Sequence, residues 1–299
     1  MDELTALEIL KKHFDFSDFS ITRCGVGMSG YVYLFSFGNG KYVLKVSPEK
    51  DAFSNSLYWF KKLYDAGVPV PLVTATGTHK GFSYIIMSYI KGKDIGLVYE
   101  NLSREEKHKI ARRVVDIQRK AAKLEPFSMD LSKPWYDFID EMLSTAKERI
   151  IAGGYFDPEK VVILEKLRKS LEGYFQSLKP QIYLDDVSTK NLLIDNGAVS
   201  GIVDIDCVGY GDALTYIALT ETALRNSGFD TEYSDFLLEE TGLTKAQKKA
   251  YAFYCLLFCV DFMGERGMTF TDKKVEVNDK VIERLNLIYK TYTDKWNLS

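Results

Sequence analysis

The hydrophobic pattern of this chain changes its period near residue 90, and that change restricts the fold more than any other feature. Before it, residues 31–37 and 41–46 are rich in aromatic and β-branched side chains, which is typical of strands. The Gly38-Asn39-Gly40 segment between them favours a tight turn and predicts an antiparallel hairpin. The first part of the chain is therefore expected to be built around a β-sheet.

Beyond Gly92 the apolar side chains recur at the spacing of helices. The clearest helical patterns span residues 103–124, 134–152 and 158–178. Ser103 and Glu106 have the spacing of a capping box at the start of the first of these helices. We predict an α+β chain with a small antiparallel β-rich lobe over residues 1–88 and a larger, mostly helical lobe over residues 89–299.

Composition and charge exclude several classes of protein. The chain has 299 residues, of which 46% are hydrophobic, so it can bury a core and is not expected to be disordered. Its 39 basic and 42 acidic residues give a net charge of −3, which provides no general attraction for nucleic acid or anionic lipid. The longest apolar run, residues 251–260, is well short of the roughly 20 residues that span a bilayer. We expect a cytoplasmic protein with no nucleic-acid or membrane partner.

Histidines and cysteines supply no catalytic or metal-binding motif. The three histidines lie far apart, which argues against a zinc site and against Ser-His-Asp hydrolysis. The four cysteines are also scattered, so the sequence predicts no disulfide framework.

A glycine-rich segment at residues 25–30 fits the pattern G-x-G-x-x-G. In a dinucleotide-binding fold this pattern opens a helix, whereas here a strand pattern follows, which nearly eliminates a dehydrogenase. In the other use of the pattern, a hairpin turn covers nucleotide phosphates with its backbone amides. The residues that would form such a cover are Gly25, Gly27, Ser29 and Gly30. On this segment alone, a phosphate-covering loop and a plain hairpin turn stay open in equal measure.

Lys45 is the only cation in the apolar run at residues 42–45. A lysine one hairpin after the glycine segment can neutralise the α- and β-phosphates of a nucleotide. The alternative is an ordinary strand lysine whose ammonium group reaches solvent.

Three oxygen-bearing side chains follow in an order that suits Mg-ATP chemistry. Asp186 stands five positions before Asn191, and Asp204 follows after a hairpin around Asn196-Gly197. One carboxylate can accept the proton of an attacking hydroxyl, while the amide and the second carboxylate offer Mg²⁺ the hard oxygen ligands that it prefers. Each could instead cap a loop, but the combination with the glycine segment and Lys45 in the correct order makes chance the poorer explanation.

Taken together, these motifs resemble those of the aminoglycoside phosphotransferase group of small-molecule kinases, and within it the hygromycin-type enzymes are the most similar. The resemblance implies the two-lobed fold of protein kinases and the cofactors ATP and Mg²⁺. The matching segments are residues 41–45, 67–71, 186–191, 201–204 and 211–213.

The resemblance also assigns roles to individual residues. It implies that Asp186 is the catalytic base, that Asn191 and Asp204 are the metal ligands, and that Lys45 binds phosphate. It places the hinge between the lobes at residues 87–92.

Within that hinge, the resemblance implies that the backbone of Ser88 and Ile90 meets the adenine ring. The smaller lobe is accordingly expected to bind the nucleotide phosphates. The larger lobe is expected to carry the catalytic loop, the metal site and the acceptor site.

Two positions depart from the pattern of the family. Its usual His-Gly-Asp reads Leu184-Asp185-Asp186 here, which places a second carboxylate beside the base. Neighbouring like charges raise the pKa of one of the two groups unless a cation offsets them. In addition, the helix before Gly67 has no acid near residues 55–56, where the family has a glutamate that pairs with the strand lysine. Both departures favour an alternative function, a nucleotide-binding pseudokinase that serves as an interaction module.

The acceptor is expected to be a small cationic molecule. Between residues 211 and 240 the chain has seven acids against a single base, Arg225, which would attract an aminoglycoside-type antibiotic. The alternative is that these acids, above all Glu239 and Glu240, form a solvated helical face. Asp185 and Asp212 are the candidate substrate-binding residues. The same kinase chemistry on choline, a sugar or an amino alcohol remains an alternative.

Overall fold

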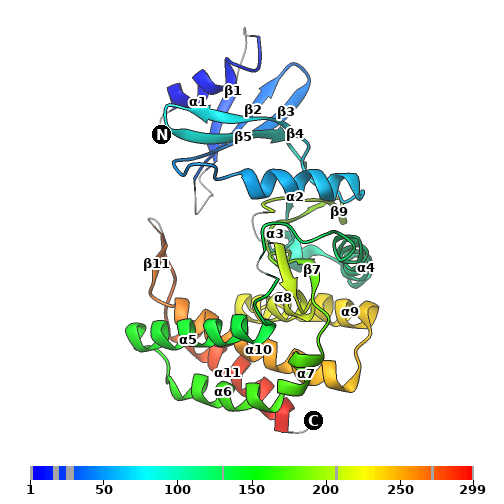
Figure 1. Ribbon diagram of the computed structural model, residues 1–299, viewed down its shortest axis with the longest axis vertical. Helices are drawn as coiled ribbons and strands as arrows, with labels where there is room; N and C mark the ends of the chain where they lie inside the picture. Colours follow the sequence, from blue (N-terminus) through cyan, green and yellow to red (C-terminus); the bar gives the residue numbers. More distant parts are fainter. Residues whose placement is uncertain are drawn as a thin grey trace. The chain divides into compact units, whose positions relative to one another are not determined.

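The computed structural model describes residues 3–15, 20–24, 30–129, 131–205, 208–270 and 273–297. The chain divides into two compact units (Figure 1). Unit 1 comprises Met1–Gly92 together with Ser200–Asp206, and unit 2 comprises Lys93–Val199 together with Cys207–Ser299. The prediction that each lobe has its own binding role stays a prediction.

Unit 1 is built around an antiparallel sheet of five strands in the order β1-β2-β3-β5-β4. The strands are β1 (Ser20–Cys24), β2 (Tyr31–Phe37), β3 (Gly40–Ser47), β4 (Val73–His79) and β5 (Phe82–Ser88). The predicted hairpin is confirmed, because Phe37 pairs with Gly40 and Gly38 adopts the positive φ of 56° that such a turn needs.

Two helices accompany this sheet, α1 (Glu3–Leu10) and α2 (Ser54–Asp65). Ile9 and Leu10 of α1 are fully buried and belong to the same apolar cluster as Leu44 and Val46 of β3. The alternation of Leu44 and Val46 along the strand directs both side chains to one face, so the amphipathic N-terminal helix covers that face.

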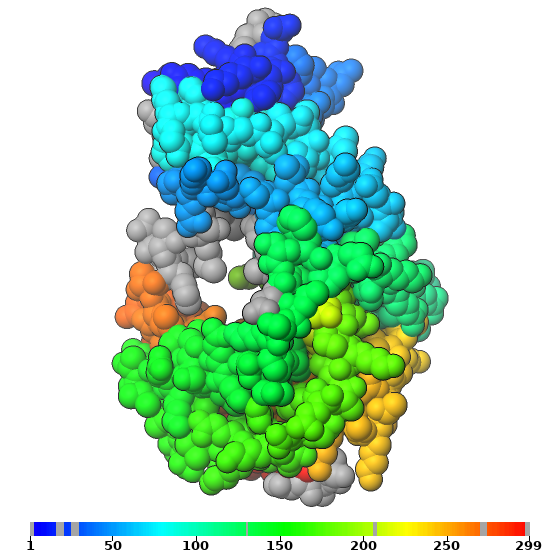
Figure 2. Space-filling view, in the orientation of Figure 1, coloured from blue at the N-terminus to red at the C-terminus, as the bar shows by residue number. Residues whose placement is uncertain are grey.

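Unit 2 is mostly helical, and the predicted fold class is confirmed. Its helices are α3 (Ile95–Val98), the 3₁₀ turn η1 (Tyr99–Asn101), α4 (Arg104–Ala121), α5 (Trp135–Gly153), α6 (Glu159–Ser170), α7 (Glu172–Ser177), α8 (Leu214–Ser227), α9 (Glu232–Thr241), α10 (Lys245–Glu265) and α11 (Asp279–Asn297). The capping box predicted at Ser103 and Glu106 is present at the start of α4. In the space-filling view, α5 and α6 (green) form much of one face of this unit (Figure 2).

Helix α10 forms the centre of unit 2 and packs against α5, α8 and α11. Its apolar run at residues 251–260 is buried throughout. No helix in the described ranges has the length and apolarity that a bilayer crossing requires.

Short strands connect the helices of unit 2. β7 (Gln181–Leu184) pairs antiparallel with β10 (Val208–Gly211), and β11 (Thr269–Phe270) pairs with β12 (Lys273–Lys274). A further sheet has the order β6-β8-β9, formed by β6 (Lys93–Asp94), β8 (Leu192–Asp195) and β9 (Ala198–Ile202). The chain passes from unit 2 to unit 1 within β9.

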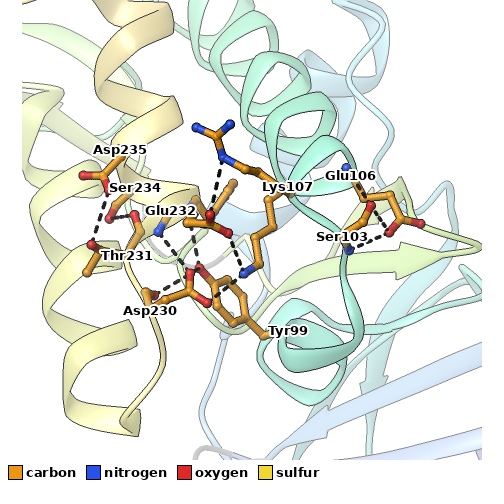
Figure 3. Close-up of polar contacts among 11 residues, drawn as sticks. Tyr99, Ser103, Glu106, Lys107, Asp230, Thr231, Glu232, Ser234 and Asp235 are labelled. Atoms are coloured by element: carbon orange, nitrogen blue, oxygen red, sulfur yellow. Dashed lines mark hydrogen bonds and ion pairs between the residues drawn. The ribbon is translucent and has the colours of Figure 1, made fainter.

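A buried ammonium group ties α4 to the start of α9 (Figure 3). Lys107, only 5% exposed, donates to Asp230 Oδ2 at 2.8 Å and to Glu232 Oε2 at 3.2 Å. The same ammonium group lies 4.4 Å from the centre of the Tyr99 ring, and the Tyr99 hydroxyl donates to Asp230 Oδ1 at 2.9 Å. A buried charge is tolerated when it is paired and hydrogen-bonded in this way, so these acids offset the cost of burying the Lys107 ammonium group.

Candidate functional site

Lys45 and Asp204, two of the predicted site residues, meet within unit 1. Lys45 lies on β3 between β2 and β5, and its ammonium group donates to Asp204 Oδ1 in an ion pair. Asp204 reaches it because the segment 200–206 packs onto unit 1, where the Ile202 N–H donates to the Pro69 carbonyl at 2.8 Å. Since residues 55–56 of α2 offer no acid, Asp204 is the carboxylate that pairs with the strand lysine.

Asp186 and Asn191 meet within unit 2, in the loop that joins β7 to β8. The Asn191 side-chain amide donates to Asp186 Oδ2 at 2.9 Å and to the Asp186 carbonyl at 3.1 Å. These two bonds close the loop and orient the exposed carboxylate of Asp186.

The loop is also attached to the elements before it. The Asn191 N–H donates to Asp94 Oδ1 at 2.9 Å, and the Gly96 N–H donates to the Thr189 carbonyl at 2.9 Å. A Cβ at Gly96 would lie 2.7 Å from that carbonyl oxygen, so only glycine allows this close approach.

The two predicted metal ligands share an unusual backbone conformation. Asn191 has a φ of 63° and Asp204 a φ of 59°. Both values lie in the left-handed region, which residues other than glycine rarely adopt. Such conformations cluster at functional sites.

The donor chemistry of these two residues fits Mg²⁺. An amide oxygen and a carboxylate are hard ligands, and Mg²⁺ is commonly held by one or two such groups together with phosphates and water. The described part of the chain contains no cluster of three or more histidine, cysteine, aspartate or glutamate side chains that could hold a metal by itself. The assignment of Asn191 and Asp204 as metal ligands stays a prediction.

Gln118 is a positioning residue that the sequence analysis missed. It lies on α4 with only 6% exposure, and its amide donates to the Leu184 carbonyl at 2.8 Å and accepts from the Leu184 N–H at 2.9 Å. This pair of bonds fixes the end of β7 two residues before Asp186. The signal in the sequence was a polar side chain on the apolar face of the helix at residues 103–124.

Asp185 differs from its neighbour Asp186 in its surroundings. It is half-buried, and burial together with the adjacent charge of Asp186 raises its pKa to about 6. It lines a cavity with Trp135 and Tyr183.

Asp212 is buried, with 5% exposure, below β10. It accepts hydrogen bonds from the hydroxyls of Tyr174 at 2.6 Å and Tyr254 at 2.9 Å, and from the Leu214 N–H at 3.0 Å. Burial raises the pKa of Asp212, while these bonds oppose the shift. A direct contact of Asp212 with substrate stays a prediction.

The predicted nucleotide contacts of unit 1 are described only in part. Gly25, Gly27 and Ser29 lie outside the described residues. Gly30 lies so close to β3 that a Cβ there would be 2.6 Å from the Val46 carbonyl oxygen.

In the predicted hinge, Ser88 donates its N–H to the Leu72 carbonyl at 2.9 Å. Ile90 packs against Gly201, where an added Cβ would lie 2.6 Å from the Ile90 side chain. The roles of both residues in adenine binding stay predictions.

The acids between residues 211 and 240 are largely engaged within the fold. Besides Asp230 and Glu232 on Lys107, Glu221 is 2% exposed and accepts from Arg225 at 3.0 Å. Glu240 pairs with Arg112 and His108. These carboxylates stabilise helix contacts, which reduces what they can offer to a cationic ligand.

Comparison with known proteins relates this chain to phosphotransferases. Residues 20–242 match the phosphotransferase enzyme family. An aminoglycoside 3'-phosphotransferase of Niallia circulans is 26% identical over 201 residues, which cover 64% of this chain and 73% of that protein. A probable ketoamine kinase of Staphylococcus aureus is 21% identical over 231 residues, which cover 73% of this chain and 77% of that protein.

Solved structures show the same architecture. The ternary complex of a thermostable aminoglycoside phosphotransferase APH(4)-Ia mutant with AMP-PNP and hygromycin B superposes with a TM-score of 0.70 at 17% identity, covering 97% of this chain and 99% of that one. The gentamicin complex of APH(2'')-IIa gives a TM-score of 0.65 at 17% identity, covering 100% of this chain and 97% of that one. At these identities the likeness establishes the fold.

Proposed function

The chain belongs to the phosphotransferase enzyme family and is a small-molecule kinase, and from this premise we propose that it transfers the γ-phosphate of ATP to a hydroxyl of an aminoglycoside-type acceptor. The observation that carries the proposal is the Lys45–Asp204 ion pair, which joins the predicted phosphate-binding lysine to a predicted metal ligand across 159 positions of sequence.

In the proposed reaction, unit 1 holds the nucleotide. The Lys45 ammonium group neutralises the α- and β-phosphates, and the backbone amides of residues 25–30 cover them. Asp204 and Asn191 are the residues that would hold Mg²⁺, which when bound neutralises charge on the phosphate oxygens. The backbone at Ser88 and Ile90 takes the adenine ring.

Asp186 acts on the acceptor. Its carboxylate, oriented by the Asn191 amide, accepts the proton of the acceptor hydroxyl. The hydroxyl oxygen forms a bond to the γ-phosphorus while the bond from that phosphorus to the leaving oxygen of ADP breaks, so the products are a phosphate ester, ADP and protonated Asp186. Positioning and charge neutralisation supply most of the rate in reactions of this kind.

Two classes of acceptor follow from the relatives, an aminoglycoside first and a ketoamine second. Both carry amino groups beside hydroxyls, which agrees with a cationic acceptor. Phosphorylation of an aminoglycoside would confer antibiotic resistance, and we place the enzyme in the cytoplasm, where ATP is available.

The test is release of ADP from Mg-ATP with a panel of acceptors. The panel contains kanamycin, hygromycin B, gentamicin, fructosyl-lysine, choline and glucose, and Asp186→Ala is the inactive variant. Asp116→Ala, an exposed change on α4, serves as the matched control and should behave as wild type. Stimulation by one class of acceptor that is lost only in Asp186→Ala supports the proposal.

Failure of every acceptor in the panel, with nucleotide still bound, would contradict the acceptor classes named here. That result would favour either an acceptor outside the panel or the pseudokinase alternative.

A further inference from the structure

Asp94 lies two positions after the predicted hinge at residues 87–92 and contacts the loop that joins β7 to β8. It ends β6 and immediately precedes α3. β6 pairs antiparallel with β8, and Asp94 stands opposite Leu193 in that pair. Backbone pairing therefore places Asp94 next to the strand into which the loop leads.

The side chain of Asp94 bonds to this loop instead of to its own helix. An aspartate at the N-cap position usually accepts a hydrogen bond from an N–H in the first turn of the helix that follows. Asp94 occupies the N-cap of α3 but makes no such bond. Its Oδ1 accepts from the Asn191 N–H at 2.9 Å, across 97 positions of sequence. The local signal for a helix cap thus predicts the wrong partner, and the actual partner is a predicted metal ligand.

This contact falls on a residue with a strained backbone. Asn191 has a φ of 63°, and a left-handed conformation of this kind persists only where the surrounding contacts determine it. Asp94 holds the N–H of Asn191, and the Asp186 carbonyl accepts from its side-chain amide at 3.1 Å. The bond to Asp94 has a carboxylate acceptor, and charge-assisted hydrogen bonds are roughly twice as strong as neutral ones. Asp94 is therefore well suited to hold the strained backbone in place.

The backbone of Asn191 also decides where the two ends of its side-chain amide point. The amide nitrogen donates to Asp186 Oδ2 at 2.9 Å and to the Asp186 carbonyl at 3.1 Å. Since an amide nitrogen donates and an amide oxygen accepts, the nitrogen orients the Asp186 carboxylate and Oδ1 is the atom that can bind a cation. A rotation of the backbone out of the left-handed region would displace both ends together.

We propose that Asp94 is a positioning residue for the metal site. By accepting the Asn191 N–H it keeps Asn191 left-handed, so that one end of the amide meets Asp186 while the other is presented to the metal. Partners that orient a ligand in this way usually matter for metal affinity although they do not bind the metal themselves. The inference rests on the proposed function and adds to it a residue that acts through Asn191.

The test measures metal binding without phosphoryl transfer. The probe is Mn²⁺ in the presence of saturating ADP, followed by the enhancement of water proton relaxation when the ion binds to the protein. Asp94→Ser removes the contact but keeps a good N-cap for α3, because the serine side chain is too short to reach the loop. Asp94→Asn keeps an acceptor oxygen at the same position. Glu100→Ala, an exposed change in the nearby 3₁₀ turn, is the control for loss of one carboxylate.

We expect Asp94→Ser to bind Mn²⁺ about tenfold more weakly than wild type, as is usual when the partner of a metal ligand is removed. Asp94→Asn should recover most of this affinity, to within about threefold of wild type, because its side-chain oxygen can still accept the N–H. Glu100→Ala should match wild type. Circular dichroism checks that each variant is folded.

A double variant shows whether Asp94 acts through Asn191. If it does, adding Asp94→Ser to Asn191→Ala should weaken Mn²⁺ binding by less than about twofold, since residues that share one interaction are not additive. Wild-type affinity in Asp94→Ser, an equal loss in Asp94→Ser and Asp94→Asn, or a full further loss in the double variant overturns the inference. An affinity for Mn²⁺ that depends on Asp94, in a protein that releases no ADP with any acceptor, would refute the proposed function while leaving the role of Asp94 intact.

Discussion

Lys45 and Asp204 form an ion pair although 159 positions separate them in the sequence. The Asp204 side chain is 48% exposed and that of Lys45 is 19% exposed. Exposed pairs contribute about 0–1 kcal/mol to stability, so this pair adds little to the stability of the fold. In the proposed reaction, the pair supplies a cation for the nucleotide phosphates and a carboxylate for the metal.

Replacing Lys45 by methionine should therefore separate function from stability. We expect Lys45→Met to raise the KM for ATP at least about tenfold, because the phosphates lose a fixed cation. The free energy of unfolding should change by less than about 1 kcal/mol. ATP saturation curves and urea unfolding measure the two effects. A wild-type KM in this variant would refute the phosphate role.

Asp204→Asn should change the magnesium dependence. The amide is a weaker ligand than the carboxylate, so the concentration of Mg²⁺ needed for half-maximal rate should rise about tenfold. Magnesium titrations at fixed ATP measure this, with Asp195→Asn on β8 as the control of equal charge. If both variants titrate like wild type, Asp204 is not a metal ligand.

Asp186→Ala should affect turnover far more than nucleotide binding. Loss of a general base lowers kcat by about 10²–10⁴-fold, whereas the affinity for a fluorescent ATP analogue should stay within about twofold of wild type. Steady-state kinetics and a fluorescence titration test the two halves separately. A kcat near the wild-type value would remove Asp186 from the mechanism.

Gln118→Leu should destabilise unit 2 and slow the reaction together. The substitution leaves the N–H and carbonyl of Leu184 without their partner, and each buried unsatisfied group costs about 1–3 kcal/mol. Urea unfolding measures the loss, and kcat reports the displaced catalytic loop. Gln176→Leu, an exposed position on α7, is the matched control. Equal stability of the two variants would show that Gln118 does not fix β7.

Asp185 should make stability depend on pH in an uncommon direction for a carboxylate. Its pKa is raised to about 6 by burial and by Asp186, so the folded state favours the protonated form. The cost of ionising it is absent below the ordinary pKa of an aspartate, grows as the pH rises toward 6, and is complete above 6.

Asp185→Asn removes this cost, so above pH 7 it should be more stable than wild type by about 1–3 kcal/mol, and at pH 4 the two should match. Tyr183 and Lys133 line the same cavity as Asp185, and Asp186 is the group whose charge adds to the cost. Unfolding curves at both pH values decide the matter. A variant that is less stable than wild type at pH 7 would contradict the prediction.

Much of the fold could be predicted because it depends on local signals. The hairpin at Gly38-Asn39-Gly40 follows from backbone conformations that only a few residues adopt, and the cap at Ser103 follows from two side chains three positions apart. The spacing of Asp186 and Asn191 within one loop pointed to kinase chemistry for the same reason. Each of these signals can be recognised within a short segment of sequence.

The remaining features depend on contacts between distant segments. The acids at 230 and 232 suggested a surface for a polycation, but their partner, Lys107, lies more than 120 positions away on a different helix. Gln118 could not be linked to Leu184 until α4 and β7 were placed together. Asp212 is buried and accepts hydrogen bonds from the tyrosines at positions 174 and 254. The residues next to Asp212 in the sequence give no sign of either contact.

Residues 200–206 belong to unit 1, although the segments before and after them in the sequence belong to unit 2. This arrangement has a consequence for engineering. A fragment that ends at Gly92 would lack both the Ile202–Pro69 hydrogen bond and Asp204, so it would be an incomplete unit 1. Chimeras that exchange the small lobe between relatives must therefore graft this distant segment as well.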